Sequence, residues 1–243
     1  MLRKILALTS ICVLATAAWA DDPWRTKAYS DWTMADVHQI LDSSPWVRTT
    51  NVDAPWIKGN VTYLQVLDTG CDGRPDMSKP MSSPPQWQVG PATVSIVGFQ
   101  ITWESSHTFR SAKMKFAVLC GRTSEESAQD LLSQEVDDYM VGIRSPDMSP
   151  FDGMDESALT QSCTLNPKKS GRKMNPSEVT ITRGADRKSV FQLTLKFPRK
   201  NDKGETTISS DEKEVEIGCQ AGKISIKTKF QPPKMLNKEG VDL

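Results

Sequence analysis

The feature that most constrains this chain is its first twenty residues, which have the composition of an export signal. Arg3 and Lys4 precede a mostly apolar run from Ile5 to Ala18, and small residues close the segment. Such a run matches the core of a secretory signal peptide and is shorter than the roughly 20 apolar residues that span a bilayer. We therefore expect residues 1–20 to be cleaved and residues 21–243 to fold as a single domain in the periplasm or as a secreted protein.

If the chain is exported, its cysteines are expected to form disulfide bonds. Cys12 lies in the signal, which leaves an even number in the mature chain: Cys71, Cys120, Cys163 and Cys219. Cysteines in even number in an exported chain predict disulfide bonds, and four of them allow three pairings. We expect Cys163–Cys219 between neighbouring strands, and Cys71–Cys120 then follows by elimination. None of the four belongs to a CxxC pair, so neither a zinc site nor a thioredoxin-type redox site is expected.

The charge distribution is uneven along the chain. Lys and Arg together number 30, as do Asp and Glu, so loss of Arg3 and Lys4 with the signal leaves a net charge of −2. Residues 121–160 are acidic, whereas residues 161–243 carry an excess of basic residues. Because these basic residues alternate with acidic ones, we interpret them as solvated outer faces of strands and expect no nucleic-acid partner. We also expect no transmembrane segment in the mature chain.

Helices are expected mainly in the N-terminal half. Thr33 and Asp36 form a capping-box pattern ahead of an apolar stripe, which predicts a helix that ends before Pro45. A second helix is expected over residues 106–119, and a third should begin at Thr123. The residues expected to form the buried face of the third helix are Ala128, Leu131, Leu132 and Val136.

After Tyr139 the apolar period changes from 3.6 to 2, which predicts strands. The expected strands cover residues 139–143, 162–165, 179–182 and 190–197, with earlier ones at 61–66 and 94–103. We expect the two earlier strands to belong to one sheet, with a proline-rich surface loop at residues 68–91 between them. Helices followed by strands predict an α+β fold, with a mostly antiparallel sandwich or curled sheet and about three helices in the N-terminal half.

A hairpin near the C-terminus is the most distinct element. Apolar residues alternate with polar ones over 215–219 and again over 224–228. A four-residue loop at 220–223 would pair Cys219 with Ile224. The expected outer-face pairs are Glu216 with Lys227 and Glu214 with Lys229, which would contribute about 0.2–1 kcal/mol each.

One aspartate is a candidate for catalysis. Asp68-Thr69-Gly70 follows an apolar run, the local pattern by which aspartic proteases place a carboxylate on a turn. That chemistry requires two aspartates that share a proton, so this chain would have to dimerise. The same three residues also make an ordinary turn. We therefore retain a hydrolase that uses Asp68 only as an alternative hypothesis.

Two loops carry acidic residues that invite comparison with calcium sites. In the first loop Asp68, Asp72, Gly73 and Asp76 match EF-hand positions 1, 5, 6 and 9, but Gly70 and Lys79 do not fit positions 3 and 12. The second loop carries Asp147, Asp152, Asp155 and Glu156. Because solvated polar loops have the same composition, we assign no metal site and keep a calcium-stabilised module as a further alternative.

The remaining candidates have structural interpretations. His38 lies beside the apolar stripe of the first helix, and His107 follows Ser105 and Ser106, which are suited to helix capping. No Gly-x-Ser-x-Gly motif or phosphate-binding glycine loop is present, so we assign no catalytic residue and no cofactor. Most of the tryptophans are expected in the core, and Trp87 in the proline-rich segment is the best candidate for an exposed contact.

Two stretches resemble an uncharacterised family of secreted proteins from environmental bacteria. They are Ala28-Tyr29-Ser30-Asp31-Trp32-Thr33 with Asp36-Val37, Ile40-Leu41 and Ser44-Pro45-Trp46, and Phe197-Pro198-Arg199 with Asp211-Glu212-Lys213-Glu214-Val215-Glu216. The resemblance implies secretion and a shared fold, and it transfers no functional residue. Together these observations favour a non-enzymatic exported protein that binds a protein partner or a component of the cell envelope.

Overall fold

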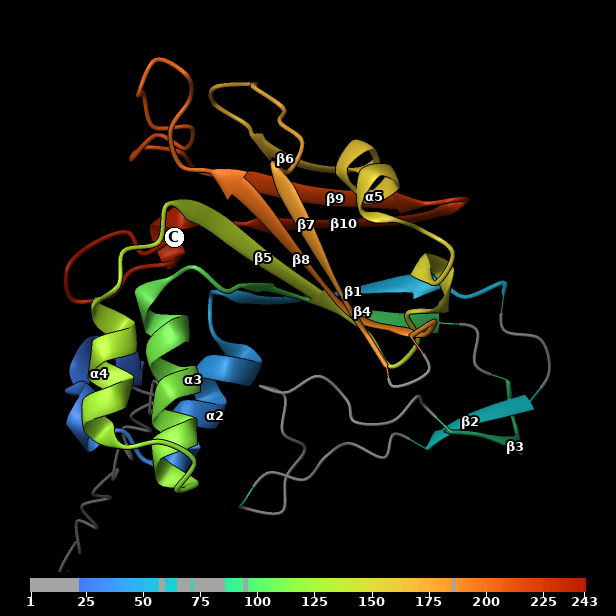
Figure 1. The fold of residues 1–243 in the computed structure, drawn as a ribbon, viewed down its shortest axis with the longest axis horizontal. Coiled ribbons are helices and arrows are strands. Elements are labelled where there is room, and N and C mark those ends of the chain that lie inside the picture. Colours follow the sequence, from blue (N-terminus) through green and yellow to red (C-terminus); the bar gives the residue numbers. More distant parts are fainter. Residues whose placement is uncertain (1–21, 57–59, 65–70, 72–85, 94–95, 185–186) are drawn as a thin grey trace, which may run out of the picture.

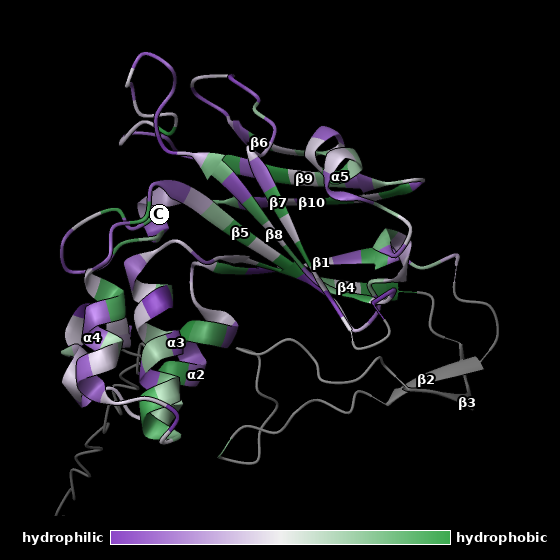
Figure 2. Ribbon diagram, in the orientation of Figure 1, coloured by the Kyte–Doolittle hydropathy of each residue, from purple (hydrophilic) through white to green (hydrophobic). Residues whose placement is uncertain are grey.

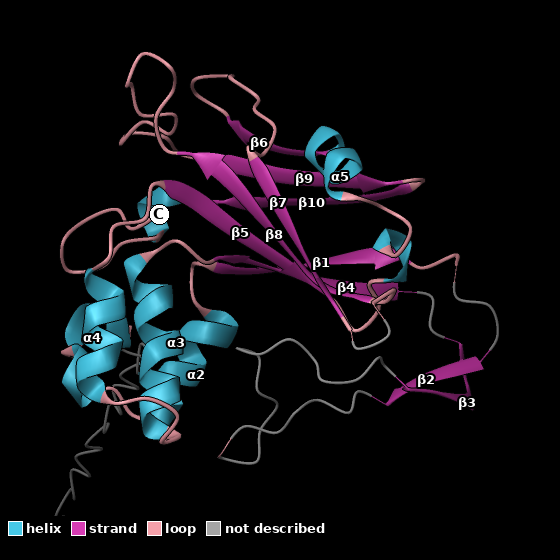
Figure 3. Ribbon diagram, in the orientation of Figure 1, coloured by secondary structure: helices cyan, strands magenta, loops and turns pink. Residues whose placement is uncertain are grey.

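The computed structural model describes residues 22–56, 60–64, 71, 86–93, 96–184 and 187–243 (Figure 1). The expected signal peptide at residues 1–20 lies outside the described residues. The fold is α+β with antiparallel sheets, as predicted, and Figure 3 shows the helices gathered mainly at one end of the strands. The α-helices are α1 (Pro23–Thr26), α2 (Met34–Ser43), α3 (His107–Leu119), α4 (Glu125–Ser133) and α5 (Glu156–Ser162).

The described strands form a five-stranded sheet in the order β1-β4-β5-β8-β7, a three-stranded sheet in the order β10-β9-β6, and the pair β2-β3. Their bounds are β1 (Val47–Asp53), β2 (Asn60–Leu64), β3 (Gln86–Thr93), β4 (Ile96–Trp103), β5 (Asp138–Arg144), β6 (Cys163–Pro167), β7 (Glu178–Arg183), β8 (Val190–Pro198), β9 (Val215–Ala221) and β10 (Ile224–Phe230). All pairings between these strands are antiparallel.

The two larger sheets bury their apolar residues in one continuous core. Strands alternate between apolar and polar residues, which Figure 2 shows as alternating colours along β8 and β9. Trp103 of β4 packs edge-to-face on Phe230 of β10, with ring centroids 5.2 Å apart. Both side chains are fully buried, so this contact joins the two sheets through their inner faces.

Helix α2 begins as predicted. The Thr33 hydroxyl accepts from the Asp36 amide at 3.3 Å, and the Asp36 carboxylate accepts from the Thr33 amide at 2.8 Å. Burial would raise the pKa of Asp36, but hydrogen bonds from Lys27 and Thr33 outweigh burial and hold that pKa below its ordinary value. Helices α2, α3 and α4 lie side by side (Figure 1), and Ser106 caps α3 through the Phe109 amide.

The prediction for α4 was wrong in two respects. The helix is capped by Ser124, whose hydroxyl accepts from the Ser127 amide at 3.1 Å, and not by Thr123. Ala128 and Leu132 are buried, but Leu131 is 46 % exposed and Val136 lies beyond the helix end. Moving the cap by one residue does not change which side chains share a face of the helix. Leu131 is exposed because only a narrow stripe of α4 packs against α3.

The register of the C-terminal hairpin differs from the prediction by two residues. The strands continue to Ala221 and Ile224, so that Cys219 pairs with Ile226 and Lys227 lies opposite Gly218. Gly222 has φ of 57°, a left-handed conformation that a two-residue hairpin turn favours at its first position. A shift by two residues preserves the faces, so the lysines still point outward.

The expected single sheet containing residues 61–66 and 94–103 is also wrong. Strand β2 pairs with β3, which occupies the last part of the segment that was expected to be a loop. Strand β4 instead pairs with β1, whose polar residues give it no clear alternation in the sequence. Helices α1 and α5, each shorter than two full turns, were likewise not predicted.

Strand β1 joins the two large sheets at their edges. The Thr50 hydroxyl donates to the Lys227 carbonyl at 3.0 Å, and Arg48 Nε donates to the Lys229 carbonyl at 3.3 Å. Strands β1 and β10 therefore meet through side chains rather than through a backbone ladder. We call this join the β1–β10 seam.

Candidate functional site

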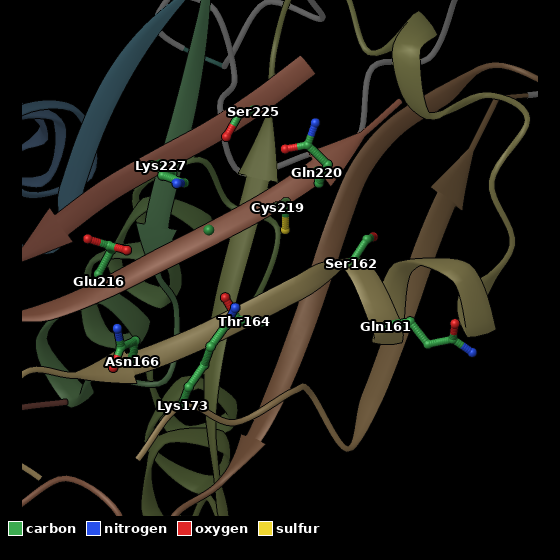
Figure 4. A pocket seen from close by; sticks show the side chains of 11 residues that line it. Gln161, Ser162, Thr164, Asn166, Lys173, Glu216, Cys219, Gln220, Ser225 and Lys227 are labelled. Atoms are coloured by element: carbon green, nitrogen blue, oxygen red, sulfur yellow. The ribbon is translucent and has the colours of Figure 1, made fainter. Parts of the chain in front are cut away.

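A polar hollow of about 470 Å³ lies on the outer face of the three-stranded sheet (Figure 4). Its lining comes from β6, β9 and β10, from the end of α5 and from the segment that follows β6. We call it the Gly218 hollow, after the glycine in the central strand. Among the polar residues that line it are Thr164, Asn166, Lys173, Glu216, Ser225 and Lys227.

The hollow exists because of the register of the three strands. Gly218 of β9 lies between Thr164 of β6 and Lys227 of β10, and Glu216 lies opposite Asn166. Because Gly218 has no side chain, the outer surface of the sheet is depressed between the side chains of Thr164 and Lys227. A Cβ atom at Gly218 would lie 3.7 Å from Lys227 Cγ and 3.7 Å from Thr164 Oγ1, which is ordinary van der Waals contact. Close packing therefore does not require the glycine.

Several side chains around the hollow have unused hydrogen-bonding groups. Those that make no hydrogen bond or ion pair within the described part of the chain are Thr164, Asn166, Lys173, Ser225 and Lys227. Elsewhere on the outer faces polar side chains do pair, as Arg144 Nε and Gln100 Oε1 do at 2.7 Å on the five-stranded sheet. The hollow thus offers hydroxyl, amide and ammonium groups to a ligand.

Glu216 supplies a negative charge at one end of the hollow. Its Oε2 atom lies 3.0 Å from Lys168 Nζ. This hydrogen bond lowers the pKa of Glu216 below its ordinary value, and the charges of Lys227 and Lys229 lower it further. Glu216 is therefore ionised at neutral pH and acts as a hydrogen-bond acceptor beside the two lysine donors.

A buried carboxylate holds the segment that contributes Lys173. Glu212 is 1 % exposed, and both its oxygens lie 3.1 Å from the Lys169 amide. It also accepts from the Lys213 amide at 3.1 Å. These bonds tie the segment after β6 to the segment before β9, so the edge of the Gly218 hollow is fixed by the fold.

The two disulfide bonds join the same cysteines as expected from the sequence. Cys163 and Cys219 are directly opposite each other on β6 and β9, on the buried face beneath the hollow, with Cα atoms 4.1 Å apart. Cys71 is joined to Cys120 at the end of α3, with Cα atoms 5.4 Å apart. The buried bond fixes the two strands whose outer face forms the floor of the hollow.

The first set of predicted site residues cannot be placed. Asp68 and the residues of the calcium-like loop, Asp72, Gly73 and Asp76, lie outside the described residues, and so does the side chain of Trp87.

The acidic residues of the second loop serve the fold separately. The buried Asp147 accepts from Trp56 Nε1 at 2.7 Å and from the Ser149 amide at 2.9 Å. Asp152 accepts from the Val190 amide at 2.8 Å. Asp155 caps α5 through the Ala158 amide, also at 2.8 Å. Within the described ranges no three His, Cys, Asp or Glu side chains form a group that could hold a metal ion.

The histidines and Ser106 lie in structural positions, whereas Ser105, also expected to cap the helix, is buried and its hydroxyl has no hydrogen-bond partner among the described residues. His38 packs edge-to-face on Phe116 and lies 3.5 Å from Asp42. His107 begins α3, and its Nδ1 atom is 3.4 Å from the Ser111 hydroxyl. Ser106 is the cap residue of that helix, as expected.

Sequence reasoning missed the Gly218 hollow. Its only local signal is a glycine at an outward position of an otherwise regular strand, flanked by polar residues two positions away on each side. The significance of that glycine depends on which residues lie opposite it, and this is a property of the fold.

None of the helices in the described part of the chain has both the length and the apolar character needed to cross a bilayer. The comparisons with known proteins give no family: no family model, no curated protein and no solved structure matches this chain.

Proposed function

We propose that this chain is an exported, non-enzymatic binding protein that holds a polar component of the cell envelope or of its surroundings in the Gly218 hollow. The observation that carries the proposal is a set of five polar side chains around a glycine that make no hydrogen bond or ion pair with the described residues. Their hydrogen-bonding groups meet water in the unliganded protein, so a ligand with matching groups can replace that water.

The rigidity of the site supports the same function. The three strands are paired along their length, one disulfide joins β6 to β9, and Glu212 fixes the adjacent segment. A preformed site loses little conformational entropy when a ligand binds. The hollow also has the volume of common small-molecule sites, about 300–1,000 Å³.

The experiment uses Gly218→Val, which fills the hollow. Valine favours strands, and its Cβ has ordinary contacts at this position, so the variant should fold. The matched control is Gly98→Val on β4, where a Cβ would also meet its nearest atoms at ordinary distances, 3.4 and 3.6 Å. Residues 21–243 of each protein are applied to an array of immobilised glycans and peptidoglycan fragments, and their thermal unfolding is measured in parallel.

We expect the wild type and Gly98→Val to bind the same array members and Gly218→Val to lose that binding while it unfolds at a similar temperature. Equal binding by Gly218→Val, or no binding to any array member by the wild type, would overturn the proposal.

A further inference from the structure

Two lysines in the Gly218 hollow, Lys173 and Lys227, form no contact ion pair within the described part of the chain. Neighbouring lysines are paired: Lys168 with Glu216 at 3.0 Å, Lys229 with Glu214 at 3.0 Å, and Lys169 with Asp211. By contrast, Lys173 and Lys227 have no carboxylate within 4.0 Å among the residues that the structure describes. Other lysines of the last third, such as Lys213 and Lys223, also have no ion pair among the described residues, but Lys173 and Lys227 are the ones that line the hollow.

The two unpaired lysines approach the hollow from different sides. Lys227 belongs to β10 and lies opposite Gly218, whereas Lys173 follows β6 and extends toward Thr164 (Figure 4). Hydroxyl and amide groups lie between them, from Thr164, Asn166 and Ser225. A ligand that satisfies this surface needs an anionic group and several groups that both donate and accept hydrogen bonds.

Building on the proposed function, we propose that the ligand is a carboxylated polysaccharide, a chain of sugar units of which some or all are uronic acids. Its carboxylates pair with Lys173 and Lys227, and its hydroxyls bond to the neutral side chains and to the Glu216 carboxylate. Hydroxyl groups can donate to Glu216, whereas a ligand with only acceptors would be repelled there.

The residues that line the hollow argue against two other polyanions. Among the residues that the structure describes, no aromatic side chain lines the hollow, so nucleic-acid bases find no stacking partner there. The described lining residues include no leucine, isoleucine or valine either, so the hollow offers the anchor residues of an acidic peptide no apolar pocket. Hydrogen bonds and charge are therefore the source of affinity.

The test compares polygalacturonate with its fully methyl-esterified form, which has the same sugar backbone without the charge. Binding to residues 21–243 is measured by titration calorimetry at two salt concentrations. We expect polygalacturonate to bind about tenfold more tightly than the ester, because charge-assisted hydrogen bonds are lost on esterification. The affinity should fall as salt rises.

The variant Lys173→Gln/Lys227→Gln should bind polygalacturonate about tenfold more weakly than the wild type. The control is Lys223→Gln, which removes an exposed lysine at the turn of the same hairpin, outside the hollow. We expect this control to bind as the wild type does. Dextran sulfate, polyglutamate and single-stranded DNA serve as competing polyanions.

Three results would overturn the proposal that the ligand is a carboxylated polysaccharide. They are equal binding of the ester, tighter binding of any competing polyanion, and loss of binding in Lys223→Gln. If a neutral glycan bound instead and Gly218→Val abolished its binding, the proposed function would stand and only the ligand class would fail. If Gly218→Val bound polygalacturonate as the wild type does, the site itself would be wrong.

Discussion

Asp242, the penultimate residue, caps the helix that begins at His107. One carboxylate oxygen of Asp242 lies 2.6 Å from the His107 amide, and the other lies 2.8 Å from the Thr108 amide. The Asp242 carbonyl also accepts from Trp46 Nε1 at 2.6 Å. The C-terminal residues thus bind the start of α3 and a core tryptophan, although more than 130 residues separate Asp242 from either of the helix amides.

Substitution Asp242→Ala should lower the free energy of unfolding by about 1 kcal/mol, because two amides at a helix N-terminus lose a charged acceptor. Asp242→Asn should lose less, since the amide oxygen still accepts one bond. Urea denaturation measures both, with Val241→Ala, a change at an exposed neighbour, as the control. A loss in Asp242→Ala no larger than that in Val241→Ala would show that the cap does not stabilise α3.

The capping box of α2 should make stability depend on pH. The pKa of Asp36 in the folded protein lies below its ordinary value of 3.8. Its stabilising contribution is therefore complete above the unfolded pKa and is lost as pH falls through the folded pKa. Asp36→Asn should be less stable than the wild type by about 1 kcal/mol at pH 7.

That difference should shrink as the pH is lowered toward about 2, because the wild-type carboxylate becomes protonated. Asp130→Asn, an exposed change on α4, serves as the control in the same denaturant titrations. A difference between Asp36→Asn and the wild type that stays constant with pH would contradict the assignment.

Glu212→Ala should destabilise the protein by about 1–3 kcal/mol, because backbone amides of Lys169 and Lys213 lose their buried acceptor. The rate of hydrogen exchange should increase most at the Lys169 amide, because Glu212 is the acceptor of its hydrogen bond. Glu239→Ala removes an exposed carboxylate and should leave both measurements unchanged. Unaltered exchange at Lys169 in Glu212→Ala would disprove the role of this carboxylate.

The two disulfides should differ in their reaction with a mild reductant. Cys71 is exposed and Cys120 is half-buried, whereas Cys163 and Cys219 are buried. An attacking thiolate must reach a sulfur atom, so Cys71–Cys120 should be reduced first. Alkylation under native conditions followed by peptide mass spectrometry gives the order, and earlier labelling of Cys163 would contradict it.

The buried disulfide should matter for stability. It closes a loop with a sequence separation of 56 residues. The double substitution Cys163→Ala/Cys219→Ala should therefore cost up to about 4 kcal/mol. Thermal unfolding of the oxidised wild type and of the variant measures the loss, and a change below about 1 kcal/mol would mean that strand pairing alone is sufficient.

Elements whose signals are local could be predicted from the sequence. The start of α2 is encoded in four neighbouring residues, Thr33 to Asp36, and the structure forms the expected capping box. The inward positions of β8 follow from simple alternation, with Leu193, Leu195 and Phe197 all buried. These features depend on backbone geometry over one or two turns or a single strand.

The candidate site could not be predicted because it depends on register. The expected pairing placed Lys227 opposite Glu216, which would have neutralised its charge. The actual turn at Gly222 places Lys227 opposite Gly218 instead. A difference of two residues in one hairpin thus changes a solvated ion pair into an unpaired lysine beside a hollow.

The β1–β10 seam affects how this protein can associate with other copies of itself at high concentration. An uncovered strand edge can recruit the same strand of another molecule and start a fibril. Thr50 and Arg48 occupy the carbonyls of Lys227 and Lys229 that such a strand would use. Two side-chain hydrogen bonds therefore supply donors to the carbonyls through which a strand of another molecule would otherwise pair.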